Sequence, residues 1–308
     1  MPESKINKKV IIVAGPTAVG KTAVAIELAK YFHTEIISAD SRQCFRELNI
    51  GVARPSEVEL QTVKHHFIAS HTINPKSKDE MIDAAVFEKF ALKTADELFK
   101  AYDIVIMVGG TGLYIKAFCE SMDDIPVVSE LLRKEIRKNY EEEGLKWLQN
   151  RIQQMDPAFY EMGEIENPQR LMRALEVVQS TGKSILEFRK GEKVIRNFDI
   201  IKIGLELPKE ELHNRINKRV DEMMLDGLLK EAMELQPHKS LNALQTVGYK
   251  ELFAYFDKEA DLNNAVELIK RNTRKYAKRQ MTWFKKDPGF VWFSPDQMDE
   301  MLKYISEK

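Results

Sequence analysis

Short apolar runs alternate along the chain with stretches of helical periodicity. Four such runs predict buried strands, because a strand covered on both faces is apolar at successive positions: residues 10–14, 35–38, 103–108 and 199–205. Residues 23–29 and 78–102 carry apolar side chains at helical spacing. Strands that alternate with helices favour an α/β fold, in which helices flank a parallel sheet.

The middle of the chain has a different character. Residues 129–182 are highly charged and helical in their spacing, and Asp156-Pro157 and Asn167-Pro168 divide them into separate helices. A linker-like segment, residues 123–126, precedes them. We therefore expect an all-helical insertion domain at residues 123–189, carried by an α/β core formed from residues 1–122 and 190–308.

A phosphate-binding loop lies between the first predicted strand and the first predicted helix. Residues 15–22 read Gly-Pro-Thr-Ala-Val-Gly-Lys-Thr, the P-loop pattern in its proper context. Its glycines let backbone N–H groups point at phosphate oxygens, and the helix N-terminus adds a partial positive charge. Lys21 supplies a full positive charge and Thr22 a hydroxyl for Mg²⁺. A chance glycine-rich turn is the alternative, which the flanking elements disfavour. The predicted fold is thus a P-loop NTPase-like sheet that binds a polyphosphate.

Two other predicted strands end in candidate site residues. Asp40 follows the second strand, on the side of a parallel sheet where ligands bind, so it could hold Mg²⁺ through water or accept a proton. It could instead cap the next turn. The strand at 103–108 ends in Gly109-Gly110-Thr111, without the acidic residue that helps an ordinary ATPase hold Mg²⁺. Thr111 could hydrogen-bond an oxyanion or a base edge, although a plain glycine turn is the alternative.

Cations cluster on three predicted helices. Arg170 and Arg173 share one face near a helix start, where cations are unfavourable for the helix dipole, which hints at an external anion. Residues 215–219 carry Arg215, Lys218 and Arg219, and an arginine there could clamp a diphosphate. For both helices, a solvated charged face is the alternative.

The third basic helix combines charge with aromatic rings. Residues 269–286 hold eight Lys and Arg residues, with Tyr276, Trp283 and Phe284 among them. This mixture suits an RNA backbone with stacked bases. The alternative is a solvated basic helix whose aromatic side chains pack inward.

Composition narrows the class of protein. The chain has 308 residues, a net charge of −1 and two cysteines, too few for a disulfide framework or a four-cysteine zinc site. His65-His66 lacks further ligands at metal-site spacing, so we expect structural hydrogen bonds there. Residues 1–9 lack the apolar core of a signal peptide, and no apolar run is long enough to span a membrane. We expect a cytoplasmic protein.

Six motifs, in order along the chain, resemble the tRNA dimethylallyltransferase (tRNA isopentenyltransferase) family. They stand at residues 15–22, 38–43, 109–114, 167–177, 215–221 and 272–280. A P-loop alone is unspecific, but the ordered series is specific and covers residues 10–286. The chain is similar to the bacterial form of the family, because no Cys/His finger follows Trp292.

The resemblance implies a prenyl transfer with tRNA as the partner. The family moves a dimethylallyl group from dimethylallyl diphosphate to N6 of the adenosine 3′-adjacent to the anticodon, position 37, and releases diphosphate. Mg²⁺ is the implied cofactor. The P-loop would then hold a leaving group instead of hydrolysing ATP. We expect a monomer that binds no membrane.

The resemblance also implies roles for individual residues. The implied catalytic residues are Asp40 as general base, Lys21, Thr111 beside the flipped adenine, and Arg219, which is favoured over Arg215 for diphosphate binding. The implied diphosphate site consists of Gly15, Pro16, Thr17, Ala18, Val19, Gly20, Lys21, Thr22 and Arg215, with Thr22 as the metal ligand. The implied tRNA contacts are Asp40, Ser41, Arg42, Gln43, Thr111, Arg133, Gln169, Arg170, Leu171, Met172, Arg173, Arg274 and Lys278.

The chain departs mildly from the family pattern at Phe45, Val52, Arg54 and residues 245–248. None of these departures changes Lys21, Thr22, Asp40 or Thr111, and those near Phe45 and Arg54 lie in a segment where the resemblance would place tRNA contacts. Two other functions compete. A P-loop kinase for a small acceptor would explain the loop and Asp40 but not the basic aromatic helix. A non-catalytic RNA-binding module would explain that helix but leave the P-loop unused.

Overall fold

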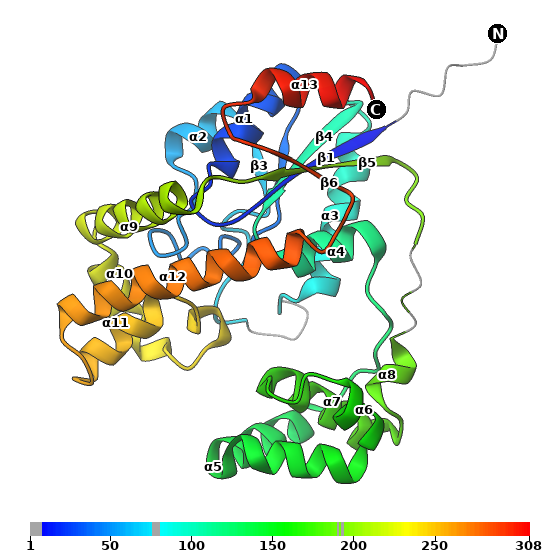
Figure 1. The fold of residues 1–308 in the computed structure, drawn as a ribbon, viewed down its shortest axis with the longest axis vertical. Coiled ribbons are helices and arrows are strands. Elements are labelled where there is room, and N and C mark those ends of the chain that lie inside the picture. Colours follow the sequence, from blue (N-terminus) through cyan, green and yellow to red (C-terminus); the bar gives the residue numbers. More distant parts are fainter. Residues whose placement is uncertain (1–7, 76–80, 190, 192–193) are drawn as a thin grey trace. The chain divides into compact units, whose positions relative to one another are not determined.

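The computed structural model describes residues 8–75, 81–189, 191 and 194–308, which form two compact units (Figure 1). One unit comprises the chain up to Cys119 together with Ile195–Lys308, and the other comprises Glu120–Val194. The sequence predicts boundaries three to five residues away, after 122 and after 189. The first residue of the predicted second core segment, 190, lies outside the described residues.

A parallel sheet forms the centre of the first unit. Its described strands are arranged in the order β3-β2-β4-β1-β5-β6, and every neighbouring pair is parallel. The strands are β1 (Lys9–Ala14), β2 (Ile36–Ser38), β3 (His65–His66), β4 (Ile104–Gly109), β5 (Asp199–Leu205) and β6 (Phe290–Phe293). The strands predicted at 10–14, 35–38, 103–108 and 199–205 are therefore confirmed, whereas β6 was not predicted.

Both faces of the sheet are covered. Ile11 and Val13 point into one core cluster, and Val10 and Ile12, which alternate with them along β1, are fully buried outside that cluster. Strands buried on both faces read as continuous apolar runs, and this is why the sequence identifies them.

Helices surround this sheet and extend beyond it. In the first unit they are α1 (Lys21–Tyr31), α2 (Glu57–Thr62), α3 (Ala84–Leu98), α4 (Gly112–Glu120), α9 (Lys209–Leu225), α10 (Leu228–Leu235), α11 (Tyr249–Phe256), α12 (Leu262–Phe284) and α13 (Met298–Ser306), with short 3₁₀ turns η2 (Gln236–His238) and η3 (Asn242–Leu244). The helix predicted at 78–102 is shorter in the structure. It begins after Asp83, whose carboxylate accepts hydrogen bonds from the N–H groups of Ala85 and Val86. Residues 78–80 lie outside the described residues.

The strand order gathers the candidate site segments. Strands β2, β4, β1 and β5 are neighbours and parallel, so the residues that follow them emerge at one edge of the sheet. Those residues are Asp40, Gly110, the P-loop and the entry to α9. Helices α9 to α12 form a second apolar cluster of this unit, and α12 packs against both α9 and α11 (Figure 1).

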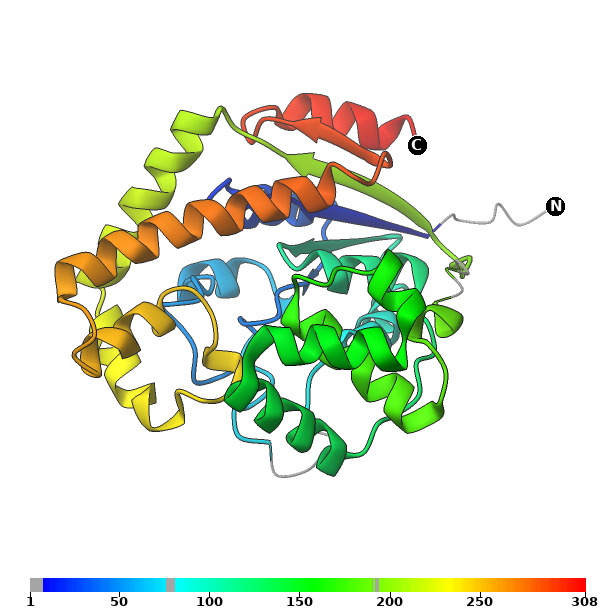
Figure 2. The same ribbon diagram turned by 60° about the horizontal axis from the view of Figure 1, so that its bottom comes forward.

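The second unit is helical and has its own core. Its helices are α5 (Glu130–Met155), α6 (Pro157–Met162), α7 (Pro168–Thr181) and α8 (Ile185–Phe188) (Figure 2). Breaks predicted at Asp156-Pro157 and Asn167-Pro168 are confirmed, because Asp156 and Asn167 cap α6 and α7. Gly144, with φ of 77°, kinks α5. Among the described residues, no helix is long and apolar enough to cross a membrane.

A core substitution in the helical unit should destabilise that unit. Leu148 of α5 is fully buried in its apolar cluster, so Leu148→Ala should cost about 2–5 kcal/mol through lost burial and the cavity left behind. Hydrogen exchange should accelerate in peptides from α5 and α7. Leu131→Ala is the matched control, because Leu131 is 82% exposed. Equal exchange in the two variants would contradict an independent core here.

Candidate active site

The P-loop joins β1 to α1 with the geometry that its sequence predicts. Gly15 and Gly20 have φ of 152° and 107°, and a Cβ at Gly15 would lie 2.6 Å from the carbonyl oxygen of Leu205. Glycine is therefore required where the loop passes the end of β5. The Lys21 ammonium donates a hydrogen bond to the carbonyl of Pro16 at 2.7 Å, so the lysine folds back over its own loop.

Two arginines of α9 reach the same loop. The Arg219 guanidinium lies 3.4 Å from the hydroxyl of Thr17, and that of Arg215 lies 3.5 Å from the carbonyl oxygen of Val19. Arg215 also forms an ion pair with Glu211, at 2.9 Å. The sequence left open which arginine approaches the loop, and the structure brings both to it.

Close cations perturb one another. Burial and, to a smaller extent, the positive charge of Arg219 lower the pKa of Lys21 to about 7, although the negative charge of Asp40 opposes both effects. Burial likewise lowers the pKa of Arg219, again against the attraction of Asp40. A polyanion would relieve this repulsion, so the arrangement is suited to bind one.

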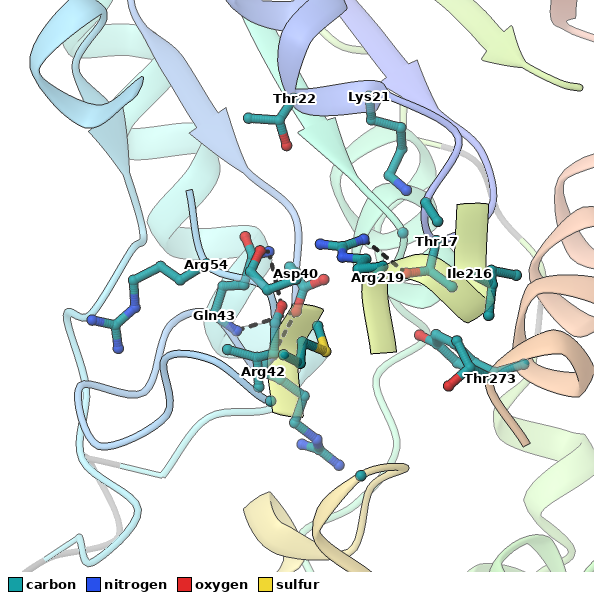
Figure 3. Close-up of a pocket in the computed structure, with 18 of the residues that line it drawn as sticks. Thr17, Lys21, Thr22, Asp40, Arg42, Gln43, Arg54, Ile216, Arg219 and Thr273 are labelled. Atoms are coloured by element: carbon teal, nitrogen blue, oxygen red, sulfur yellow. Dashed lines mark hydrogen bonds between the residues drawn. The ribbon is translucent and has the colours of Figure 1, made fainter. Parts of the chain in front are cut away.

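Asp40 follows β2 and also shapes the turn after it. Its Oδ1 accepts hydrogen bonds from the backbone N–H groups of Arg42 at 2.8 Å and Gln43 at 3.2 Å. The capping role considered from the sequence is thus present. Both bonds use one oxygen, and Asp40 lines the cavity together with the P-loop, so its carboxylate can still face a ligand (Figure 3).

Thr111 connects two site segments. Its Oγ1 accepts a hydrogen bond from the N–H of Ser41 at 3.0 Å and donates one to the Ser41 hydroxyl at 3.3 Å. Its own N–H donates to the carbonyl of Ala39 at 3.2 Å. Gly109 and Gly110 line the cavity beside it. The contacts of Thr111 therefore fix the backbone around Asp40.

A cavity of about 560 Å³ joins these groups in the first unit. The polar part of its lining includes Lys21, Thr22, Asp40, Arg42 and Arg219 (Figure 3). Arg215 lines the cavity as well. Another part is apolar and comes from the second apolar cluster, with Val52, Val220, Met223, Leu228, Val247 and Ile269 in its lining. The cavity thus suits a ligand with a charged end and an apolar end.

Two side chains that organise this cavity were missed by sequence reasoning. Glu231 of α10 accepts hydrogen bonds from the N–H groups of residues 49, 50 and 51 and from the Tyr249 hydroxyl, and so fixes the loop that carries Val52. Gln280 of α12 contacts both the P-loop and Gly110. A signal for Gln280 existed, because it interrupts the apolar stripe of α12 between Ala277 and Phe284.

The other residues of the loop after Asp40 mostly bind the loop itself. The Gln43 amide donates to the carbonyls of Val52 and Ala53, and the Arg54 guanidinium donates to those of Phe45, Arg46 and Leu48. Arg42 lies 3.2 Å from the side chain of Asn242. Ser41 and Arg42 line the cavity as well.

The basic helix α12 presents both kinds of predicted side chain. Tyr276 and Trp283 are each more than a third exposed, and Tyr276 lines the cavity with Thr273. Lys278 is exposed, whereas Arg274 donates a hydrogen bond to Asn217. Phe284, in contrast, is buried, so the alternative of inward packing holds for that ring but not for the other two.

Candidate tRNA contacts in the helical unit lie on α5 and α7. Arg133 and Arg173 both contact Glu176, and Arg170 forms an ion pair with Glu164. Gln169 is exposed. Leu171 and Met172 were predicted to contact tRNA, but their side chains are buried in the core of the unit, because they occupy the apolar stripe of α7. Any contact there would have to come from neighbouring side chains.

The paired histidines make structural contacts. His66 lies 2.6 Å from Glu35, and the ring of His65 lies 2.7 Å from the carbonyl of Val63. Within the described residues, no group of three or more His, Cys, Asp or Glu side chains could hold a metal ion.

The fold and the cavity define a P-loop α/β protein whose cavity is suited to a polyphosphate. The family model described as IPP transferase matches residues 43–287. The tRNA dimethylallyltransferase of Christiangramia forsetii is 47% identical, with 98% of this chain and 99% of that one covered. Its counterpart from Cytophaga hutchinsonii is 44% identical, with 99% of each chain covered. The chain therefore belongs to the tRNA dimethylallyltransferase family.

Solved structures agree in fold. The full-length tRNA isopentenylpyrophosphate transferase of Bacillus halodurans superposes with a TM-score of 0.70 at 32% identity, covering 97% of this chain and 96% of that one. A eukaryotic dimethylallyltransferase studied acting on tRNA gives a TM-score of 0.75 at 25% identity, covering 97% of this chain and 77% of that one.

Anion binding at this site should weaken as pH rises above 7. The pKa of Lys21 is about 7 in the free protein, so its ammonium loses the proton above that pH, whereas bound diphosphate would favour the charged form. Binding then takes up a proton, and the dissociation constant of inorganic diphosphate should rise by up to about tenfold per pH unit from about pH 7 to 9. Calorimetry of wild type and Lys21→Ala checks this. The same slope in both proteins would contradict it.

Proposed function

We propose that this protein transfers a dimethylallyl group from dimethylallyl diphosphate to N6 of adenosine 37 in tRNA and releases diphosphate. The observation that carries the proposal is the two-sided cavity. Its polar wall presents a P-loop, Lys21 and two arginines, its apolar part is built from the α9–α12 cluster, and Asp40 lies at the polar side. The relatives described above, which are tRNA dimethylallyltransferases, support the same reaction.

The diphosphate end of the donor suits the polar wall. Amide N–H groups of the P-loop, the Lys21 ammonium and the guanidinium groups of Arg215 and Arg219 would neutralise its charge. The short hydrocarbon end would contact apolar side chains such as Met223 and Val247, which favour its burial. In this orientation the charge of the diphosphate would be compensated by cations, and the hydrocarbon end would be covered by apolar side chains.

The reaction needs charge stabilisation more than a strong base. The allylic carbon–oxygen bond breaks, its electron pair leaves with diphosphate, and the adenine N6 lone pair forms the new carbon–nitrogen bond. Lys21 and Arg219 would stabilise the negative charge that develops on the leaving group. The N6 proton passes to the Asp40 carboxylate. Thr111 would act through the backbone, because its hydrogen bonds hold the segment that carries Asp40.

The oxygen groups in the cavity suit Mg²⁺ that arrives with the diphosphate. Mg²⁺ prefers hard oxygen ligands and often takes few from the protein when phosphates supply the rest. The hydroxyl of Thr22 and the carboxylates of Asp40 and Glu59 line the cavity. Thr22 would hold the ion, which would add positive charge next to the leaving group.

The tRNA would be bound by segments of both units. In the first unit these segments are Ser41–Gln43, directly after Asp40, and the part of α12 that carries Arg274 and Lys278. In the second unit, the exposed polar side chains of α7 would bind the anticodon arm. The target adenine must leave the base stack to reach a deep site, as in other enzymes that modify bases. We further propose that the protein acts as a cytoplasmic monomer.

Removing the Asp40 charge should remove the transfer. Asp40→Asn keeps an oxygen for the N–H groups of Arg42 and Gln43 but cannot take the N6 proton, so the rate should fall by about 10²–10⁴-fold. Label from radioactive dimethylallyl diphosphate entering unmodified tRNA measures it. Asp83→Asn, at the start of α3, is the matched control and should keep the activity.

Two outcomes of that assay would contradict the proposal. Full activity of Asp40→Asn would remove Asp40 from the proton transfer. No incorporation by folded wild-type protein would favour a P-loop kinase instead, and ATP consumption with small hydroxyl acceptors would then be measured.

Removal of Mg²⁺ should stop transfer without unfolding the protein. Chelation with EDTA should abolish incorporation, because the leaving group loses its counter-charge, and added Mg²⁺ should restore it. The melting temperature should not change, since the described residues contain no group of three or more His, Cys, Asp or Glu side chains that could hold a metal ion without phosphate ligands. Undiminished transfer in EDTA would show that Lys21 and the arginines suffice.

A further inference from the structure

Gln280 lies between two segments of the active site that are far from it in sequence. Its Oε1 accepts a hydrogen bond from the N–H of Thr17 at 2.8 Å, and its Nε2 donates one to the carbonyl of Gly110 at 2.9 Å. The side chain is 7% exposed. One amide therefore connects α12, the P-loop and the end of β4.

The contact with Gln280 determines which groups of Thr17 can face a ligand. P-loop N–H groups ordinarily point at phosphate oxygens, but the N–H of Thr17 is taken by Gln280. With its backbone held on that side, the Thr17 hydroxyl lies 3.4 Å from the guanidinium of Arg219. Gln280 therefore fixes the residue that meets the arginine at the diphosphate side of the cavity.

Only a neutral carboxamide satisfies both contacts. The site needs one acceptor for Thr17 and one donor for Gly110, which a glutamine supplies without adding charge. A glutamate would lose the donor and place a negative charge beside a polyanion. The fit is tight, because a Cβ at Gly110 would lie 2.3 Å from the Gln280 nitrogen.

The helix that carries Gln280 also faces the rest of the cavity. Thr273, Tyr276 and Gln280 occupy successive turns of α12, and all three line the cavity. Lys278, one of the predicted tRNA contacts, is on the same helix and exposed. A displacement of α12 would therefore reach the P-loop through the Gln280 amide.

We propose that Gln280 is a positioning residue that holds the P-loop at Thr17 in the geometry that grips the diphosphate leaving group. The proposal rests on the function proposed above. Loss of the amide leaves Thr17 free to turn away from Arg219, and the developing charge on the leaving group is then less well stabilised. tRNA binding does not depend on this contact.

The test compares two substitutions on α12. Gln280→Met keeps length and burial but loses both hydrogen bonds, whereas Thr282→Val, on the exposed side of the same helix, loses only a bond to the Lys278 carbonyl. Binding of inorganic diphosphate with Mg²⁺ is measured by calorimetry and binding of a labelled anticodon stem–loop by anisotropy. Steady-state transfer gives kcat and KM for each substrate.

Gln280→Met should weaken diphosphate binding about tenfold, the effect of one to two lost hydrogen bonds, and should lower kcat by at least the same factor. Its stem–loop affinity and its KM for tRNA should stay within about twofold of wild type. Thr282→Val should match wild type in every measurement. Gln280→Glu should also bind diphosphate weakly, because it keeps the acceptor but adds a charge.

Other results would overturn the inference. A Gln280→Met protein that melts at a lower temperature but binds diphosphate and turns over like wild type has lost only a structural contact. Equal losses of diphosphate and stem–loop binding would indicate a general disturbance of α12. An inactive wild-type protein would refute the proposed function, whereas the diphosphate titration would still test the positioning of the P-loop.

Discussion

The structure depends on keeping two buried cations, Lys21 and Arg219, close to each other. Both lose hydration on burial, and their repulsion contributes to the lowered pKa of Lys21. Such an arrangement is unfavourable unless groups of opposite polarity hold it. The carbonyl of Pro16 binds the ammonium, the hydroxyl of Thr17 lies beside the guanidinium, and Asp40 attracts both cations. The positive charge of Lys21 and Arg219 that these groups do not compensate is available to stabilise a diphosphate leaving group.

The order of the strands makes this arrangement possible. Strand β5 lies directly beside β1, so the helix that follows it can bring Arg215 and Arg219 to the loop that follows β1. The close passage of Gly15 over the carbonyl of Leu205 shows how little space separates the two segments. A larger residue at position 15 would move the loop away from the arginines, so the glycine pattern of the P-loop also serves the charge of α9.

The sequence predicts what depends on neighbours in the chain and misses what depends on distant partners. Four strands can be predicted because burial on both faces makes each of them a continuous apolar run in the sequence. The P-loop can be predicted because a strand precedes it and a helix follows it. The contact of Gln280 with Thr17 spans 263 positions, and that of Glu231 with Gly51 spans 180. No local pattern contains such a pair.

The tRNA contacts predicted on α7 show a similar limit of sequence motifs. Leu171 and Met172 belong to a motif that also contains exposed residues, so the motif alone could not separate side chains that face the core from those that face solvent. The helical period of α7 does separate them, because both lie on its apolar stripe. Motif and periodicity therefore have to be applied together, residue by residue.

A P-loop that serves prenyl transfer differs from one that serves hydrolysis in the groups around it. Here the cavity lining also includes apolar side chains, among them Met223, Leu228 and Val247, and glycines instead of a carboxylate stand at the end of β4, at Gly109 and Gly110. An apolar surface keeps water from an allylic cation, and the glycines let an acceptor approach the backbone closely. In the proposed reaction Asp40, which follows the neighbouring strand β2, would have only to take one proton from an amine that attacks carbon. The same loop that would polarise a phosphorus centre in a hydrolase thus needs only to stabilise the diphosphate that departs.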